Sequence, residues 1–123
     1  MLARILVVED DPVGRDLICD ILRTEGHQPL EATDGAEALE LYQAQCLDLV
    51  ITDFVMPKLN GLKLIEQLRL FSPRLPIILV TAYLSIIARR IMLRDIVEVV
   101  PKPFEIDFLK STVRRLLVNS AAR

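Results

Sequence analysis

The chain has 123 residues, of which 52% are hydrophobic and 26% are charged, and its formal net charge is −2. This length is typical of one domain whose core is large enough to fold without a disulfide or a metal. The hydrophobic content excludes a disordered chain, no apolar run approaches the ~18–20 residues of a membrane span, and the slight acidity argues against a general nucleic-acid binder.

The cysteines and the first residues of the chain indicate the cellular compartment. Cys19 and Cys46 stand in no CxxC pattern, so we expect reduced and mostly buried thiols. The first apolar run, at 5–8, ends at once in acidic residues, whereas a signal peptide carries a longer apolar stretch. We therefore expect a cytoplasmic protein.

Short apolar runs alternate with longer segments of helical periodicity. In chain order, the predicted elements are a strand at 5–8, a helix at 12–24, a strand at 28–32, a helix at 36–45, a strand at 47–52, a helix at 62–71, a strand at 77–80, a helix at 84–94, a strand at 97–100 and a helix at 104–118. The runs are continuous and β-branched, which is typical of parallel strands buried on both faces. The sequence therefore predicts a doubly wound α/β fold with helices on both sides of a five-stranded parallel sheet.

Charged and hydroxyl residues stand at or close to the ends of four of the predicted strands. They are Glu9, Asp10 and Asp11 after the first strand, Asp53 after the third, Thr81 after the fourth and Lys102 after the fifth. In open α/β sheets, ligands bind beyond the carboxyl ends of the strands. We therefore expect these side chains to meet at one edge of the sheet.

This set of side chains suits phosphoryl transfer. Converging carboxylates repel one another, so one pKa rises unless a cation joins them, and oxygen ligands with open water positions favour Mg²⁺. Asp53 is the natural nucleophile, because carboxylates accept phosphoryl groups. Lys102 would offset negative charge, and the Thr81 hydroxyl would donate to a phosphoryl oxygen.

Each of these residues by itself has a simpler explanation. An aspartate after a strand is often a turn or cap residue, and Asp11 before Pro12 is expected to cap a helix. Thr81 alone suggests a turn, and Lys102 alone suggests a solvated surface charge. Their joint occurrence at the strand ends favours one functional site.

Four motifs, in their order and spacing, are very specific. They are Ile5-Leu6-Val7-Val8-Glu9-Asp10-Asp11, Asp53-Phe54-Val55-Met56-Pro57-Lys58-Leu59-Asn60-Gly61, Thr81-Ala82 and Lys102-Pro103-Phe104. On these motifs the chain resembles the response regulator receiver family of two-component signalling, over roughly residues 4–117. The resemblance implies a flavodoxin-like fold with five helices and the strand order 2-1-3-4-5.

The resemblance also implies a metal site. Asp53 looks like the phosphoacceptor, and Asp10 and Glu9 look like the acidic pair that binds Mg²⁺, Asp10 directly and Glu9 through water. Asp53 and the backbone carbonyl of Val55 would complete the ligands. Asp11 follows the pair and is expected to stay outside the ligand set.

By the same resemblance, Thr81 would sense the phosphoryl group and Lys102 would pair with it, with a cis Lys102–Pro103 bond. A sensor histidine kinase or phosphotransfer protein would supply the group from a phosphohistidine, and the aspartyl phosphate would later hydrolyse. The chain would thus catalyse its own phosphorylation and dephosphorylation without turning over a separate substrate. No direct contact with nucleic acid or membrane is expected.

Some positions depart from the family pattern. Val99 stands where an aromatic residue usually swings inward on activation, and Asp95 and Ile96 replace a common Gly-Ala pair. Pro101, directly before the lysine, lacks a strand N–H, which is tolerable at the end of an edge strand. We therefore expect an atypical fourth helix and fifth strand.

The fourth helical segment is rich in apolar residues. Ile86 and Leu93, together with Phe108 on the last helix, are a candidate surface for a homodimer or an effector. The alternative is that this helix is simply well buried or irregular.

Two other functions stay open on the sequence. One is a degenerate receiver that binds a protein partner constitutively. The other is a small-molecule phosphatase with an aspartyl nucleophile, although such enzymes commonly carry a second acid where this chain has Val55. We expect a receiver at 1–119 and a tail or cut linker at 120–123, from either a stand-alone receiver or a larger regulator or hybrid kinase.

Overall fold

The computed structural model describes residues 2–54, 61–82 and 97–121. In chain order, the elements are β1 (Arg4–Val8), α1 (Pro12–Thr24), β2 (Gln28–Ala32), α2 (Gly35–Ala44), β3 (Leu49–Asp53), α3 (Gly61–Phe71), β4 (Ile77–Thr81), β5 (Val97–Pro101) and α5 (Ile106–Ala121). Four of the five predicted helices are among them, and the predicted helix at 84–94 lies outside the described residues.

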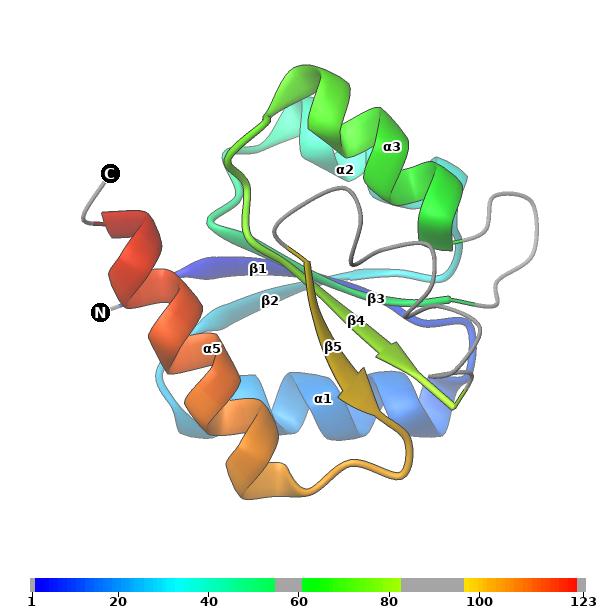
Figure 1. Ribbon diagram of the computed structural model, residues 1–123. Coiled ribbons are helices and arrows are strands. Elements are labelled where there is room, and N and C mark those ends of the chain that lie inside the picture. Colours follow the sequence, from blue (N-terminus) through cyan, green and yellow to red (C-terminus); the bar gives the residue numbers. More distant parts are fainter. Residues whose placement is uncertain (1, 55–60, 83–96, 122–123) are drawn as a thin grey trace.

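The five strands form one parallel sheet in the order β2-β1-β3-β4-β5, which confirms the predicted topology. Helices α1 and α5 lie on one face of the sheet, and α2 and α3 lie on the other (Figure 1). Pro101 ends β5, an edge strand, where it stands opposite Thr81 of β4. Its missing N–H is therefore tolerated, as the sequence predicts.

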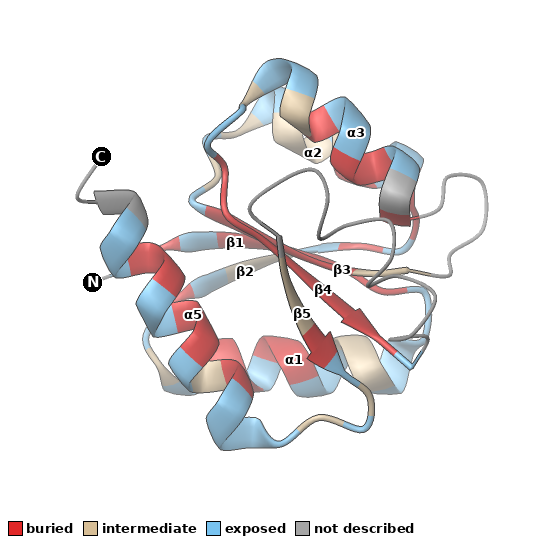
Figure 2. Ribbon diagram, in the orientation of Figure 1, coloured by how far each residue is buried: buried red, intermediate tan, exposed pale blue. Residues whose placement is uncertain are grey.

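Alternating residues along the strands pack into two hydrophobic cores, one on each face of the sheet. Ile5 and Val7 of β1 pack in a cluster with α1 and α5, whereas Leu6 and Val8 pack in a cluster with α2 and α3. Figure 2 shows buried residues along the central strands and on the helix faces turned toward them. Burial on both faces explains why the strands read as continuous apolar runs.

Helix α1 begins where the sequence predicts a cap. The Asp11 side chain accepts a hydrogen bond from the Gly14 amide at 3.2 Å, and Pro12 occupies the first helical position. Beyond the end of the helix, Gly26 has φ of 84°, a left-handed conformation that favours glycine. The cap keeps Asp11 at the helix end, while the preceding Glu9 and Asp10 stand at the end of β1.

Three predicted bounds are wrong by a few residues. Strand β3 begins at Leu49 rather than Leu47, because its pairing with β1 starts at the Ile5–Leu49 pair. Helix α5 begins at Ile106 rather than Phe104, since the Leu109 amide donates to the Glu105 carbonyl. It also continues to Ala121, past the predicted end at residue 118.

The two cysteines differ in environment. Cys19 is buried, and burial raises the pKa of its thiol to about 11, with a smaller contribution from Glu31. Cys46 is exposed, so the prediction of burial is wrong for this residue, which lies in the loop between α2 and β3. Neither forms a disulfide. Within the described ranges, no helix has both the length and the apolar character needed to cross a membrane.

His27, just before β2, couples stability to pH. Its side chain is buried, and its Nδ1 accepts a hydrogen bond from the Ala3 amide at 3.2 Å. Burial lowers the pKa of His27 below its ordinary 6.5, although the carboxylates of Glu25 and Asp48 oppose this shift. Because the unfolded chain then binds the proton more readily, the stability that neutral His27 contributes is complete above about pH 6.5 and is lost as the pH falls.

We therefore expect the free energy of unfolding to fall more steeply in the native chain than in His27→Asn when the pH drops from about 7.5 to 5.5. Asparagine keeps an acceptor for the Ala3 amide but does not titrate. Urea unfolding at both pH values measures the effect, and groups common to the two proteins cancel. A fall of equal size in both proteins would contradict the prediction.

Candidate functional site

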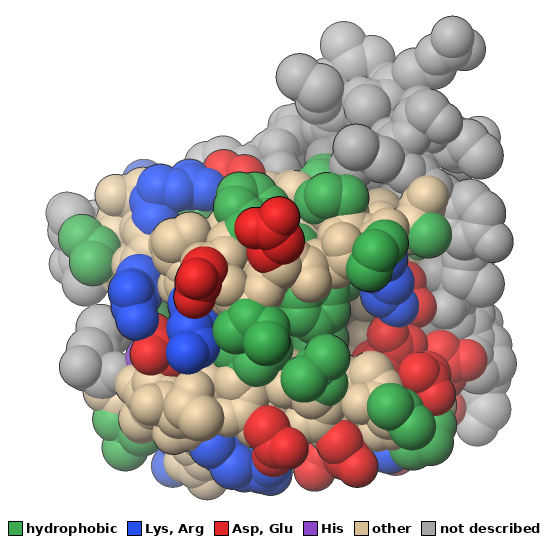
Figure 3. Space-filling view, turned by 90° about the horizontal axis from the view of Figure 1, so that it is seen from below, with side chains coloured by type: hydrophobic (Ala, Val, Ile, Leu, Met, Phe, Trp, Pro, Cys, Tyr) green, Lys and Arg blue, Asp and Glu red, His purple; other side chains and the backbone are tan. Residues whose placement is uncertain are grey.

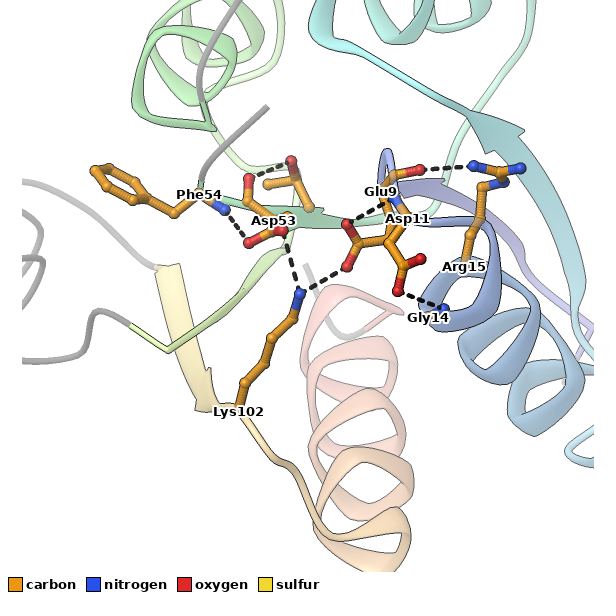
Figure 4. Close-up of polar contacts among 8 residues, drawn as sticks. Glu9, Asp11, Gly14, Arg15, Asp53, Phe54 and Lys102 are labelled. Atoms are coloured by element: carbon orange, nitrogen blue, oxygen red, sulfur yellow. Dashed lines mark hydrogen bonds and ion pairs between the residues drawn. The ribbon is translucent and has the colours of Figure 1, made fainter. Parts of the chain in front are cut away.

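Four charged side chains meet at the carboxyl edge of the sheet. Glu9 and Asp10 follow β1, Asp53 ends β3, and Lys102 follows β5. The Lys102 Nζ donates to Glu9 Oε1 at 2.7 Å and to Asp53 Oδ2 at 3.1 Å (Figure 4). Residues 93 positions apart in the chain are therefore in direct contact, because parallel strands end at the same edge.

The three carboxylates are close enough to share one ion. Glu9, Asp10 and Asp53 each offer an oxygen, and these atoms lie within 4.8 Å of one another. Glu9 is buried, Asp53 is partly buried and Asp10 is exposed. Hard oxygen donors with one side open to water fit Mg²⁺, which keeps several water ligands.

The electrostatics of the site follow from burial and charge. Burial raises the pKa of Glu9 to about 7; the hydrogen bond from Lys102 opposes this shift, and the charge of Asp53 adds to it. Burial alone would lower the pKa of Lys102, but its hydrogen bond to Glu9 and the charge of Asp53 raise it overall. Lys102 therefore stays protonated and supplies a positive charge between Glu9 and Asp53.

Of the other predicted site residues, the structure describes Thr81 and Val99 but not Val55. Thr81 is fully buried at the end of β4, and its carbonyl accepts a hydrogen bond from the Lys102 amide at 2.8 Å. Val99 is partly buried and packs against the cluster formed with α2 and α3. Val55 lies outside the described residues, as do Asp95 and Ile96. The Lys102–Pro103 bond is cis, as predicted.

Three further contacts hold the site, and none of them is predicted from the sequence. The Phe54 amide donates to Asp53 Oδ1 at 2.7 Å, and the Thr52 hydroxyl donates to the Asp53 carbonyl at 3.0 Å. The Arg15 Nη1 donates to the Glu9 carbonyl at 2.9 Å. No sequence motif signals these contacts, because two of them use backbone acceptors and the third uses a backbone donor.

Gly61 lies against the backbone that carries Asp53. Its amide donates to the Phe54 carbonyl at 2.8 Å, and a Cβ there would run into the Asp53 carbonyl oxygen and lie 2.9 Å from the Phe54 Cα. We expect Gly61→Ala to lower the free energy of unfolding by about 1–3 kcal/mol, because backbone atoms must move. It should also shift the NMR signal of the Phe54 amide.

Gly26→Ala is the control for this substitution. No atom lies within 4 Å of a Cβ at Gly26, so alanine there adds only the strain of a positive φ. It should cost about 1–2 kcal/mol and leave the Phe54 signal in place. An unchanged Phe54 signal in Gly61→Ala would refute the expected displacement.

A model of the response regulator receiver domain family matches residues 5–114. The chain belongs to this family. The receiver domain is similar to response regulator MprA of Mycolicibacterium vanbaalenii, at 38% identity over 118 residues that cover 95% of this chain and 51% of MprA. It is also 34% identical to sensor histidine kinase RcsC of Salmonella typhimurium over 110 residues, which cover 89% of this chain and 12% of RcsC.

The chain thus spans about half of one relative and a small part of the other. Among solved structures, the receiver domain of the sensor histidine kinase PA1611 from Pseudomonas aeruginosa has a TM-score of 0.85 at 27% identity, covering 95% of this chain and 98% of that one. In that structure a magnesium ion is coordinated in the active-site cleft. Receiver-domain membership and the assembled charges leave the degenerate alternative without support.

The candidate partner surface is described only in part. Phe108 on α5 is 44% exposed, and Leu17 and Val13 on α1 are also exposed. Figure 3 views the side on which Figure 1 places α1 and α5, and hydrophobic side chains gather near its centre. Ile86 and Leu93 lie outside the described residues, so the predicted surface with Phe108 stays a prediction.

Proposed function

We propose that this receiver domain accepts a phosphoryl group on Asp53 and acts as a phosphorylation-dependent switch. The observation that carries the proposal is the bridge from Lys102 Nζ to both Glu9 and Asp53, beside Asp10. This arrangement sets a carboxylate nucleophile next to a cation and two further acids. Such a group of side chains matches the charge needs of phosphoryl transfer.

The transfer itself is an in-line displacement. A lone pair of the Asp53 carboxylate attacks phosphorus, the bond from phosphorus to the donor's histidine nitrogen breaks, and that nitrogen keeps the electron pair and takes up a proton. The hydrogen bond from the Phe54 amide to Oδ1 and that from Lys102 to Oδ2 fix the carboxylate. Lys102 then pairs with the phosphoryl oxygens, and water later attacks the aspartyl phosphate.

Glu9, Asp10 and Asp53, with the carbonyl of Val55, are the proposed Mg²⁺ ligands. The closeness of the three carboxylate oxygens supports this assignment. Bound Mg²⁺ would supply positive charge that screens the incoming phosphoryl group. Asp10 is the exposed member of the set, so we assign the direct ligand to Asp10 and a water-mediated contact to the buried Glu9.

Thr81 is the proposed sensor of the phosphoryl group. It ends β4, beside the strand that ends in Asp53, and its backbone is bonded to Lys102. Its hydroxyl would donate to a phosphoryl oxygen and bias the surface near the last strands and helices. Val99 replaces the usual aromatic partner, so this switch would work with a smaller side chain.

Receiver domains partner with histidine kinases or phosphotransfer proteins, and we propose that one of these is the phosphoryl donor here. The match to part of a sensor histidine kinase and to half of a response regulator supports this class of partner. We also propose a cytoplasmic location, where such donors would meet the domain, and a homodimer or effector contact through Ile86, Leu93 and Phe108.

The test uses the native chain with acetyl phosphate and Mg²⁺. The expected result is a mass gain of one phosphoryl group that depends on Mg²⁺ and decays with time as the acyl phosphate hydrolyses. Peptide mapping after reduction with borohydride should place the group at Asp53. No mass gain, or a gain mapped to another residue, would refute the proposed function.

A further inference from the structure

Arg15 lies beside the acidic site, but its side-chain hydrogen bonds go to other groups than the carboxylates of that site. It stands on α1, its side chain is only 16% exposed, and it makes two directed contacts. Nη1 donates to the backbone carbonyl of Glu9 at 2.9 Å, and Nε donates to Glu31 Oε1 on β2 at 3.1 Å. Figure 4 shows the guanidinium reaching the Glu9 backbone on the side away from Lys102.

The backbone of Glu9 is thereby held at both of its polar groups. Its amide donates to the Ala32 carbonyl at the end of β2 at 3.1 Å, and its carbonyl accepts from Arg15. Glu9 is only 2% exposed while Arg15 is in place, so its carbonyl relies on a protein donor rather than on water. A buried carbonyl without a donor is unfavourable, so the backbone would turn to find one.

That backbone sets the direction of two carboxylates. The peptide bond from Glu9 to Asp10 includes the carbonyl that Arg15 holds, and the Glu9 side chain is in turn held by Lys102 at 2.7 Å. A rotation of this peptide would move the Asp10 carboxylate relative to those of Glu9 and Asp53. The peptide that joins two of the three acids is therefore held by a contact from outside the acidic cluster.

The charge of Arg15 is balanced elsewhere. Its ion pair with Glu31 supplies a carboxylate from β2, so the guanidinium has its own counter-charge and is not the cation that offsets the site. What it gives to the site is a directed N–H group at a fixed place.

We propose that Arg15 is a positioning residue that orients Glu9 and Asp10 for Mg²⁺ through the Glu9 carbonyl, an inference that rests on the proposed function. Residues that orient metal ligands from outside the ligand set commonly change metal affinity by about 10–100-fold when they are removed. We expect a loss of this size in Arg15→Met, which keeps the apolar stem and removes the donors.

The direction in which the Mg²⁺ affinity changes distinguishes a positioning role of Arg15 from a purely electrostatic one. Removal of a cation near a cation site would, by charge alone, strengthen Mg²⁺ binding. Calorimetric titration of Mg²⁺ into Arg15→Met should instead show weaker binding than in the native chain. Arg23→Met is the matched control, because Arg23 is on the same helix and pairs with the exposed Asp20. It should bind Mg²⁺ as the native chain does.

Amide hydrogen exchange without Mg²⁺ gives a second readout. Arg15→Met should exchange faster at Glu9, whose amide bonds to Ala32, while amides of β3 and β4 keep their native rates. A general rise at all amides would indicate only lower stability and would overturn the proposal, as would native or tighter Mg²⁺ binding. Arg15→Leu, which also lacks N–H donors, provides the same comparison if Arg15→Met does not fold.

The two proposals fail differently. A native chain that takes up no phosphoryl group from acetyl phosphate refutes the proposed function. A native chain that is phosphorylated on Asp53, with an Arg15→Met variant that matches it in Mg²⁺ affinity and in Glu9 exchange, refutes only the role of Arg15.

Discussion

The Asp53→Asn variant is expected to take up no phosphoryl group from acetyl phosphate, whereas the native chain gains one. The substitution removes the nucleophilic carboxylate, and an amide oxygen is a far weaker nucleophile. Its size is almost unchanged, so Oδ1 can still accept the hydrogen bond that the Phe54 amide now donates at 2.7 Å. The fold should therefore survive, and the loss is chemical.

Intact-mass spectrometry measures this result over time in the presence of Mg²⁺. Asp20→Asn is the control, because Asp20 is an exposed aspartate on α1 that pairs with Arg23. It should be phosphorylated at the native rate. A mass gain that persists in Asp53→Asn at the native rate would show that another residue is the acceptor.

The second large effect is expected for Lys102→Met. Lys102 is the ammonium bonded to both Glu9 and Asp53, so it supplies positive charge where the phosphoryl oxygens would arrive. Loss of one such donor commonly costs about 10²–10³-fold in rate. We expect the rate of phosphorylation by acetyl phosphate to fall by this factor at saturating Mg²⁺.

Lys102→Met should also lower the stability of the unphosphorylated domain. Without Lys102, the carboxylates of Glu9 and Asp53 face each other with no ammonium between them, so the free energy of unfolding without Mg²⁺ should fall by about 1–3 kcal/mol. Added Mg²⁺ should recover part of this loss, because a ligand that binds only the folded state stabilises it. Urea unfolding with and without Mg²⁺ measures both quantities.

Lys110→Met serves as the control for both measurements, because Lys110 is a lysine within α5 and not at a strand end. It should keep the native phosphorylation rate and stability. A Lys102→Met variant that is phosphorylated at the native rate would contradict the role assigned to its ammonium.

The contacts of Lys102 explain why its loss should lower both the stability of the domain and the rate of phosphorylation. In the structure its ammonium bonds the carboxylates themselves, at 2.7 Å to Glu9 and 3.1 Å to Asp53. A phosphoryl group on Asp53 would bring three strong acceptor oxygens to the same place, and Lys102 would then exchange a carboxylate partner for one of them. The expected loss of rate and the expected loss of stability come from these two states.

Much of the fold could be predicted from the sequence. The apolar runs at 5–8 and 77–80 form strands because a continuous apolar run can be buried on both faces of a sheet. Asp11 and Pro12 begin α1 as predicted, since a cap is a local contact within one turn. The bounds near Leu47 and Phe104 are wrong because they depend on pairing and packing with distant segments.

The burial of the two cysteines gives a contrasting case. Cys19 lies on the face of α1 that packs against the sheet, in one cluster with Ile18 and Leu22, so its predicted burial is confirmed. Cys46 lies in a loop between α2 and β3, where no periodicity applies, and it is exposed. Residue type alone predicts burial for both cysteines.

For the candidate site, the sequence by itself determined which residue types stand at which strand ends. It follows that Glu9, Asp10, Asp53 and Lys102 meet at one edge, because parallel strands bring their carboxyl ends together. Only the tertiary structure decided how they meet: that Glu9 is buried, that Lys102 bonds two carboxylates, and that Arg15 holds the Glu9 carbonyl. These contacts depend on packing and on backbone groups, and a backbone carbonyl is the same in every residue, so no sequence pattern marks the one that Arg15 binds.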